Sequence, residues 1–161
     1  MRVGHGFDAH RLVPDRRLIL GGVHVPFERG ALGHSDADVL AHALADALLG
    51  AAALGDLGSY FPDTDMRYKD ANSMDLLTSC ADEVRLVGYR IANVDATILL
   101  EHPKLAPFIS AMRTEIARAL QLDIGCVSIK AKTSEGMGYT GDGSGIAAHA
   151  VALIEAERED G

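Results

Sequence analysis

Apolar residues recur at helical spacing between residues 36 and 54, and this pattern predicts a helix. Ser35 or Asp36 is available as its N-cap. The segment is rich in alanine, so we expect the helix to be well buried. Its apolar positions are Val39, Leu40, Ala43, Leu44, Ala47 and Leu48.

Two further helices are predicted from the same kind of spacing. One runs from Ser73, as its N-cap, to Val87, and Gly88 lies where a left-handed residue commonly ends a helix. The other spans roughly residues 105–120. Pro103 and Pro107 lie near its start, where a missing backbone donor costs little.

Extended segments are predicted at both ends of the chain and between the helices. Gly21-Gly22 separates residues 17–20 from residues 23–27 and supplies the positive φ angles of a tight turn. These segments therefore form a predicted hairpin, with Pro26 at an edge or a strand end. Residues 146–157 are rich in alanine but also alternate, and we predict a final strand there. The other predicted strands are residues 1–10, 90–100 and 127–132.

The order of these elements predicts the fold class. Strands come before, between and after the helices, which favours an α+β fold with helices layered on one face of a mixed sheet. At 161 residues the chain fits a single domain covering residues 1–161. Residues 55–65 and 136–145 are predicted loops. The first is dense in acidic and turn residues, and long aperiodic loops are uncommon unless they have a function.

Composition and charge exclude several classes of protein. The formal charge of −8 argues against a general affinity for nucleic acid, which requires an excess of Lys and Arg. Two cysteines are too few for a disulfide framework, and we expect both to be small core residues. The chain opens without a basic and apolar leader, and Asp46 interrupts its longest apolar stretch. We therefore expect a cytoplasmic protein that binds no membrane.

Candidate chemistry begins with Asp8-Ala9-His10. Residues two apart in an extended segment project to the same side, so Asp8 and His10 can face one ion, and His42 can complete the set. Two imidazoles and one carboxylate suit zinc and leave a fourth position for water or substrate. The alternative is that Asp-x-His is a common pair and His42 a hydrogen-bonded core histidine. The spacing alone leaves both interpretations open.

Two neighbouring patterns add to this hypothesis. Asp38, His42 and Asp46 are spaced four apart and share one helical face, so either acid could accept the second imidazole proton of His42. The alternative is a hydrated polar stripe. At the end of the strand 127–132, Thr133 and Glu135 fall on one side and could act on a phosphate with its magnesium ion. Strand ends often carry such residues, so this pattern is weak alone.

Taken together, these stretches resemble the family of 2-C-methyl-D-erythritol 2,4-cyclodiphosphate synthase. The matching blocks span nearly the whole chain: GHGFDAHRL, LGHSDADVLAHALADALLGAAALGDLGSYFPDTD, NVDATI, HPKL and KAKTSEGMGYTGDGSGI. The resemblance implies a homotrimer whose sheets pack inward, with active sites between neighbouring subunits. It also implies a reaction of the non-mevalonate isoprenoid route: 4-diphosphocytidyl-2-C-methyl-D-erythritol 2-phosphate is cyclised, and CMP is released.

The resemblance assigns roles residue by residue. Asp8, His10 and His42 match zinc ligands, and Glu135 matches the carboxylate that helps hold magnesium or manganese. His34 and Thr133 match residues that stabilise the transition state. Substrate-binding positions match Asp8, His10, His34, Ser35, Asp56, Leu57, Gly58, Phe61, Pro62, Asp63, Thr64 and Asp65. In the second half of the chain, in and around an implied cytidine pocket of the adjoining subunit, they match Leu100, Pro103, Leu105, Ala106, Ala131, Lys132, Thr133, Ser134, Glu135 and Tyr139.

One segment departs from the family pattern. Many members carry an Arg-Gly-Glu-Gly run after the aromatic residue, and their arginines line an axial cavity that can hold an isoprenoid diphosphate. This chain has Asp142 in that segment. Three such carboxylates near the axis would repel a diphosphate, so we expect this chain to lack that axial ligand.

Two other functions remain open at this stage. A zinc phosphohydrolase would explain the ligands but not the implied cytidine pocket. A non-catalytic, metal-binding trimer would explain the fold, although every metal-ligand position holds a competent residue.

Overall fold

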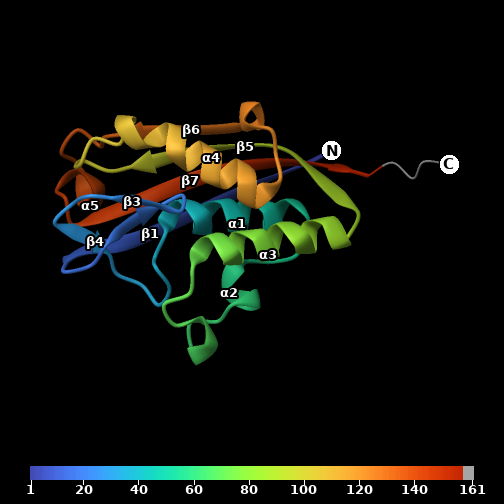
Figure 1. Ribbon diagram of the computed structural model, residues 1–161, viewed down its shortest axis with the longest axis horizontal. Coiled ribbons are helices and arrows are strands. Elements are labelled where there is room, and N and C mark those ends of the chain that lie inside the picture. Colours follow the sequence, from blue (N-terminus) through green and yellow to red (C-terminus); the bar gives the residue numbers. More distant parts are fainter. Residues whose placement is uncertain (158–161) are drawn as a thin grey trace.

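A five-stranded mixed sheet forms the frame of the computed structural model, which describes residues 1–157 (Figure 1). Its strand order is β4-β1-β7-β5-β6, and all neighbours are antiparallel except β5 and β6, which are parallel. A separate hairpin pairs β2 with β3. The strands are β1 (Arg2–Pro14), β2 (Leu18–Leu20), β3 (Val23–Val25), β4 (Arg29–Ala31), β5 (Tyr89–Leu99), β6 (Val127–Lys132) and β7 (Gly145–Ala156).

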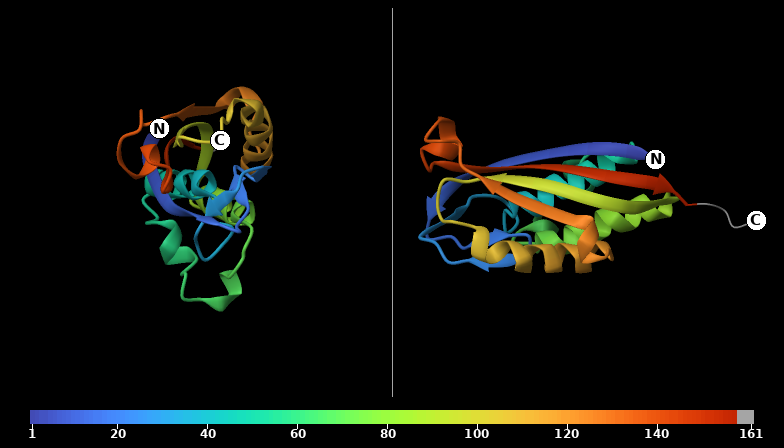
Figure 2. Two further views of the ribbon diagram at one scale, coloured as in Figure 1. Left: turned by 90° about the vertical axis from the view of Figure 1, so that its left-hand side faces the viewer. Right: turned by 90° about the horizontal axis from the view of Figure 1, so that it is seen from above.

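Three main helices pack on one side of this sheet (Figure 2). α1 lies against β1 and β7, and α3 and α4 lie beside it, against β5 and β6. The α+β class with a mixed sheet is therefore confirmed, as are the hairpin and the final strand. The helices are α1 (Val39–Ala51), α2 (Leu57–Tyr60), α3 (Ser73–Leu86), α4 (Ile109–Leu120) and α5 (Gly138–Gly141).

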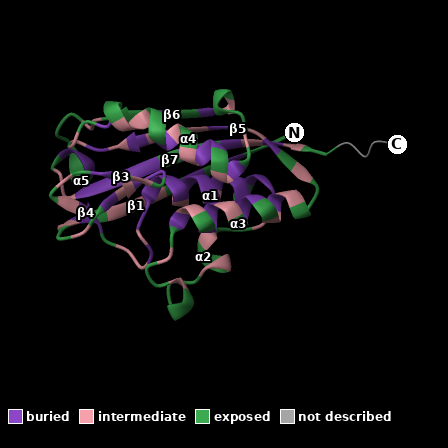
Figure 3. Ribbon diagram, viewed as in Figure 1, coloured by how far each residue is buried: buried purple, intermediate pink, exposed green. Residues whose placement is uncertain are grey.

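Alternation along the strands separates a covered face of the sheet from an open one. In β1, Gly4 and Gly6 are buried beneath α1, whereas His5 and Phe7 point away from it and are exposed. Figure 3 shows the consequence, with buried residues concentrated where α1 meets β1 and β7. Because residues two apart share a face, Asp8 and His10 continue the covered row of β1.

Helix α1 packs closely against two glycines of β1. A Cβ atom at Gly6 would lie 1.9 Å from the Ala43 carbonyl oxygen, and one at Gly4 would lie 2.0 Å from the Ala47 carbonyl oxygen. Only glycine leaves room for backbone to approach backbone in this way. The contact brings the start of α1 over β1, so that His42 lies beside Asp8.

The start of α1 differs from the prediction. Its N-cap is Asp38, not Ser35 or Asp36. The fully buried Asp38 carboxylate accepts hydrogen bonds from the backbone N–H groups of Gly21, Gly22 and Ala41 at 2.8–3.0 Å. Burial raises its pKa, although the three donors oppose that shift. Asp38 therefore ties the β2–β3 turn to α1, which is why it outcompetes its neighbours as the cap.

Several other boundaries also differ from the predictions. The N-cap of α3 is Asn72, not Ser73, and the predicted helix 105–120 begins as a 3₁₀ turn at Ala106–Phe108. The predicted loops 55–65 and 136–145 contain the short helices α2 and α5. Strand β4 was not predicted separately. Gly88, by contrast, follows α3 with a φ of 84°, as expected.

The two cysteines are free thiols in different settings. Cys80 is buried in the core, and burial raises its pKa to about 12. Cys126 is only partly buried, so the expectation of a core position is wrong for this residue. Among the described residues, no helix has both the length and the apolar character needed to cross a membrane.

Two matched substitutions test the contact between α1 and β1. We expect Gly6→Ala to destabilise the protein by about 3 kcal/mol or more, because its Cβ meets a backbone oxygen that cannot move aside. Gly50→Ala in α1 is the control, since no atom lies within 4 Å of its added Cβ. It should stabilise the helix by about 0.5–1 kcal/mol. Urea unfolding measures both, and equal effects would contradict the packing described.

Candidate metal centre and cleft

Three potential metal ligands converge where β1 passes beneath the start of α1. The Asp8 carboxylate oxygen Oδ2 lies 2.8 Å from His10 Nε2 and 3.0 Å from His42 Nδ1. One ligand atom from each residue lies within 4.8 Å of the others. The spacing of Asp8 and His10 along one face of β1, together with the close approach of α1, therefore gathers the three predicted ligands into one cluster.

The orientation of His10 suits metal binding. Its Nδ1 lies 2.9 Å from the Leu32 carbonyl oxygen, an acceptor, so Nδ1 carries the proton and Nε2 has the free lone pair. Nε2 is buried and has no hydrogen-bond partner of acceptable geometry, although it faces Asp8. A buried nitrogen lone pair beside a carboxylate and a second imidazole fits a divalent transition metal such as zinc.

His42 is held by hydroxyl groups and not by the predicted acids. Its Nε2 lies 2.8 Å from Ser73 Oγ and 3.2 Å from Ser35 Oγ. Asp38 is occupied by backbone donors, and Asp46 accepts from the Leu57 N–H at 2.7 Å. The prediction that Asp38 or Asp46 fixes the His42 proton is therefore wrong. The spacing of four places these acids on one helix face, but the Nε2 edge of His42 points to the beginning of α3.

Two residues missed by sequence reasoning support this arrangement. Ser73 is buried and donates from its hydroxyl to Asp36 Oδ1 in a short hydrogen bond, and its N–H donates to Asp36 Oδ2 at 3.1 Å. Asp36 Oδ1 also accepts from the Asp38 N–H at 3.1 Å. Ser73 was read only as a helix cap. The sequence signal that could have pointed to Asp36 and Ser73 is the run of polar residues at the start of α1 and of α3.

The charges in the cluster reinforce one another. Burial opposes ionisation of Asp8, but its close contacts with His10 and His42 outweigh burial and hold the pKa of Asp8 at about 2. Burial also opposes the charged form of His42 and so lowers its pKa, but the neighbouring Asp8 carboxylate has the larger combined effect and raises the pKa overall. Asp8 is thus an anion at neutral pH, and it attracts positive charge to this point.

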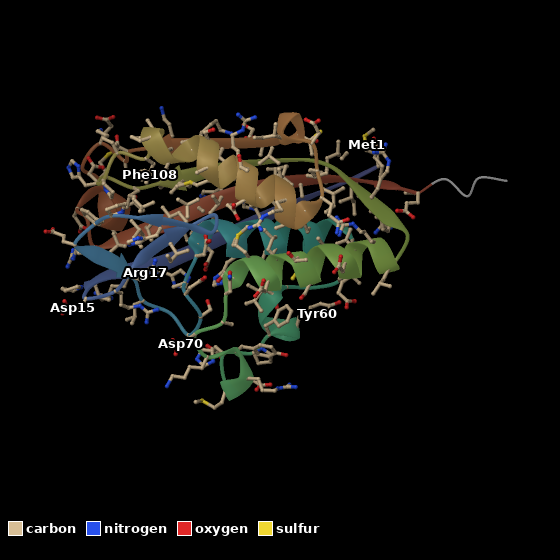
Figure 4. All side chains as sticks on the ribbon, in the orientation of Figure 1. Met1, Asp15, Arg17, Tyr60, Asp70 and Phe108 are labelled. Carbon is tan, nitrogen blue, oxygen red and sulfur yellow. The ribbon has the colours of Figure 1, made fainter. Side chains whose placement is uncertain are left out.

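A cleft of about 470 Å³ opens beside the cluster. Its wall on one side is the segment from α2 to the 3₁₀ turn at Met66–Tyr68, which hangs below α1 and α3 between Tyr60 and Asp70 (Figure 4). Gly33, Tyr68 and Leu76 also line the cleft and were not predicted. The predicted residues that line it are Asp8, His10, His34, Ser35, His42, Leu57, Gly58, Phe61, Pro62 and Asp63.

Three of the substrate-binding residues predicted in the first half of the chain do not line this cleft. Asp56 caps α2 through the Ser59 N–H at 2.8 Å, and Thr64 is exposed. Asp65 pairs with Arg67, while its carbonyl oxygen lies 3.2 Å from His34 Nε2. His34 therefore carries a proton on Nε2 and helps to hold this wall of the cleft.

A second cavity, of about 230 Å³, lies where β5 and β6 end beside α4. It shares no lining residue with the metal-side cleft. Next to it, Thr133 Oγ1 donates to Glu135 Oε1 at 3.1 Å, so the two residues meet as predicted. Ser134 and Glu135 do not line the cavity itself. The predicted residues that do are Leu100, Pro103, Leu105, Ala106, Ala131, Lys132 and Thr133.

The remaining predicted positions lie near the beginning of β7. Tyr139 is about half exposed and lines a third cavity of about 230 Å³, together with His10 and Arg11. Asp142 is exposed and accepts from the Ser144 N–H at 2.8 Å, which lowers its pKa. Its carboxylate is therefore ionised at neutral pH and available to the solvent.

The Asp8, His10 and His42 cluster opens into the cleft. Three protein ligands with an accessible fourth position are typical of catalytic metal sites, so the fold and the cluster define the class of proteins with an open metal centre of this kind. The chain belongs to the YgbB family, which it matches over residues 1–155.

Relatives with a known name agree on one activity. The chain is 60% identical over 161 residues to the 2-C-methyl-D-erythritol 2,4-cyclodiphosphate synthase of Moorella thermoacetica, covering 100% of this chain and 98% of that protein. A solved structure of a synthase of this name, in a form bound to CDP, superposes with a TM-score of 0.88 at 38% identity and covers 96% of this chain and 100% of that one. The bifunctional IspDF of Campylobacter jejuni gives 0.93 at 43% identity; there the match covers 96% of this chain and 42% of the longer one.

Removal of one imidazole tests the metal centre. We expect His42→Ala to weaken zinc binding by more than about 100-fold, beyond the usual effect of losing only a supporting hydrogen bond. The control is His24→Ala, because His24 is exposed on β3 and lies outside the cleft. Competition with a chromophoric chelator measures zinc affinity, and normal affinity in His42→Ala would refute the ligand set.

Proposed function

We propose that this chain converts 4-diphosphocytidyl-2-C-methyl-D-erythritol 2-phosphate into 2-C-methyl-D-erythritol 2,4-cyclodiphosphate and CMP. The activity is that of a phosphorus–oxygen lyase in non-mevalonate isoprenoid biosynthesis. The observation that carries this proposal is the Asp8, His10 and His42 cluster opening into the cleft. The name shared by its relatives supports the choice of substrate. One hydrophobic core joins the five-stranded sheet, the β2–β3 hairpin and the helices, which supports a single catalytic domain.

The chemistry of the residues fits an intramolecular attack of phosphate on phosphorus. The 2-phosphate is already an anion and needs no general base, so the barrier comes mainly from charge repulsion and geometry. When bound at Asp8, His10 and His42, zinc would supply Lewis acidity toward the β-phosphate. His34 and Ser35 line the same cleft and would help to position the phosphate groups, while Leu57, Gly58 and Phe61 can hold the erythritol portion.

We propose that the second cavity receives the cytidine of a substrate bound mainly by a neighbouring copy. Two observations support a composite site: the cavities share no lining residue, and Thr133 and Glu135 lie outside the metal-side cleft. A relative binds CDP. Glu135 would help to hold magnesium or manganese between the phosphates, and Thr133 would hydrogen-bond a phosphate oxygen.

A homotrimer with its sheets turned inward would join the two halves of the site. The open face of the sheet supports this arrangement, because it exposes large apolar side chains that would gain from burial, namely Val3, Phe7 and Val151. In such an assembly each substrate molecule would be bound by residues of two neighbouring subunits. We propose a cytoplasmic location, which the two free thiols support.

Phosphorus NMR tests the proposed reaction directly. Protein incubated with the substrate, zinc and magnesium should produce the cyclic diphosphate together with CMP. Linear hydrolysis products would instead identify a zinc phosphohydrolase. Absence of turnover in protein that retains zinc would indicate a non-catalytic, metal-binding role.

A charge-removing substitution tests the role of Glu135. Glu135→Gln should raise the magnesium concentration needed for half-maximal turnover by about 10-fold or more, because a neutral amide is a poor ligand for a hard cation. Zinc content should not change. Glu115→Gln on α4 is the matched control, since its carboxylate pairs with Arg118 away from both cavities. An unchanged magnesium requirement in Glu135→Gln would contradict the assignment.

A further inference from the structure

We propose that Asp36 and Ser73 are positioning residues that select which nitrogen of His42 faces the metal. The inference rests on the proposed metal role of the Asp8, His10 and His42 cluster. It concerns two residues outside the ligand set, one in the loop before α1 and the other at the first position of α3. Ser73 contacts the edge of His42 that points away from Asp8, and Asp36 acts on that edge through Ser73.

The direction of each hydrogen bond follows from the chain of partners. An ionised carboxylate only accepts, so Asp36 requires the Ser73 hydroxyl to donate its single hydrogen. The Ser73 oxygen can then only accept from His42 Nε2, 2.8 Å away. Nε2 must therefore carry a proton. The lone pair of His42 is left on Nδ1, the atom that lies 3.0 Å from Asp8 Oδ2.

Ser35 is consistent with the same directions. Its hydroxyl oxygen accepts from the Ala37 N–H at 3.1 Å and lies 3.2 Å from both Ser73 Oγ and His42 Nε2. Because His42 Nε2 is a donor, the Ser35 hydrogen can point to the second lone pair of Ser73. The two serine hydroxyls and His42 Nε2 then all have hydrogen-bond partners, and the directions assigned above stay the same.

The pair is also anchored firmly enough to impose this orientation. Ser73 is only 1% exposed, and its N–H and hydroxyl both end on Asp36. The Asp36 N–H donates to the Ala71 carbonyl oxygen at 3.1 Å, so the loop before α1 and the start of α3 hold each other. An unpaired imidazole N–H at this partly buried point would be unfavourable, which penalises the flipped ring.

A serine between histidine and aspartate has a specific electrostatic consequence. Asp8 already brings one negative charge into contact with the ligand nitrogens. The intervening hydroxyl keeps the Asp36 charge one residue further away while still polarising the imidazole, which increases its basicity as a ligand. The metal therefore experiences a stronger His42 ligand without a second adjacent carboxylate.

Zinc titration of three variants tests the proposal without substrate. Ser73→Ala should weaken zinc binding by about 10–100-fold, the usual range for losing a supporting partner of a ligating histidine. Ser73→Thr keeps the hydroxyl and should restore most of that affinity. Ser79→Ala is the matched control, because its exposed hydroxyl on α3 bonds only the Asp75 carbonyl oxygen. Normal affinity in folded Ser73→Ala would overturn the proposal.

Nitrogen NMR of the zinc-loaded wild-type protein gives a second readout that does not depend on zinc affinity. We expect His42 to bind zinc through Nδ1, with a protonated Nε2 whose hydrogen exchanges slowly with water. Exchange should become faster in Ser73→Ala. Zinc bound through Nε2 would overturn the proposal. If the wild-type protein binds zinc through His42 Nδ1 but does not turn over the substrate, the result would argue against the proposed reaction and not against the positioning role.

Discussion

The direct backbone contact between α1 and β1 is the constraint on which the rest of the structure depends. Gly4 and Gly6 allow the carbonyl oxygens of Ala47 and Ala43 to approach within distances that any side chain would prevent. The next residues along the covered face of β1 are Asp8 and His10, and Asp8 meets His42 near the start of α1. The metal cluster is thus a continuation of the packing that holds the sheet to its first helix.

A second set of contacts converts this proximity into a defined geometry. Asp38 fixes the start of α1 against the β2–β3 turn, while Ser73 and Asp36 fix the far edge of His42 against α3. Leu32 does the same for His10 through its carbonyl oxygen. Each of the two imidazoles is therefore oriented by a segment other than its own, so the geometry of the cluster depends on how these segments pack together.

Local patterns in the sequence predicted the ligands but not what supports them. Alternation in β1 placed Asp8 and His10 on one face, because that relation depends on periodicity alone. The position of His42 beside them required the packing of α1 on β1. The caps and the His42 partner were predicted wrongly. Each helix start offers several residues that can act as its N-cap, and contacts made by distant segments decide between them. The candidates are Ser35, Asp36 and Asp38 for α1, and Asn72 and Ser73 for α3. The family resemblance, and not the local patterns, implied a separate cytidine pocket, and the fold gathers the substrate positions around two cavities that share no lining residue.

The pairing of the first and last strands has a consequence for how the molecule is made. Residues 2–11 of β1 pair with residues 145–154 of β7, so the centre of the sheet joins segments almost a chain length apart. Such non-local pairing slows folding, because a long loop must close before its contacts form. During synthesis, α1 can reach β1 early, but its surface against β7 stays uncovered until the final strand leaves the ribosome. The buried, alanine-rich helix is therefore the segment of a growing chain that most needs protection from aggregation.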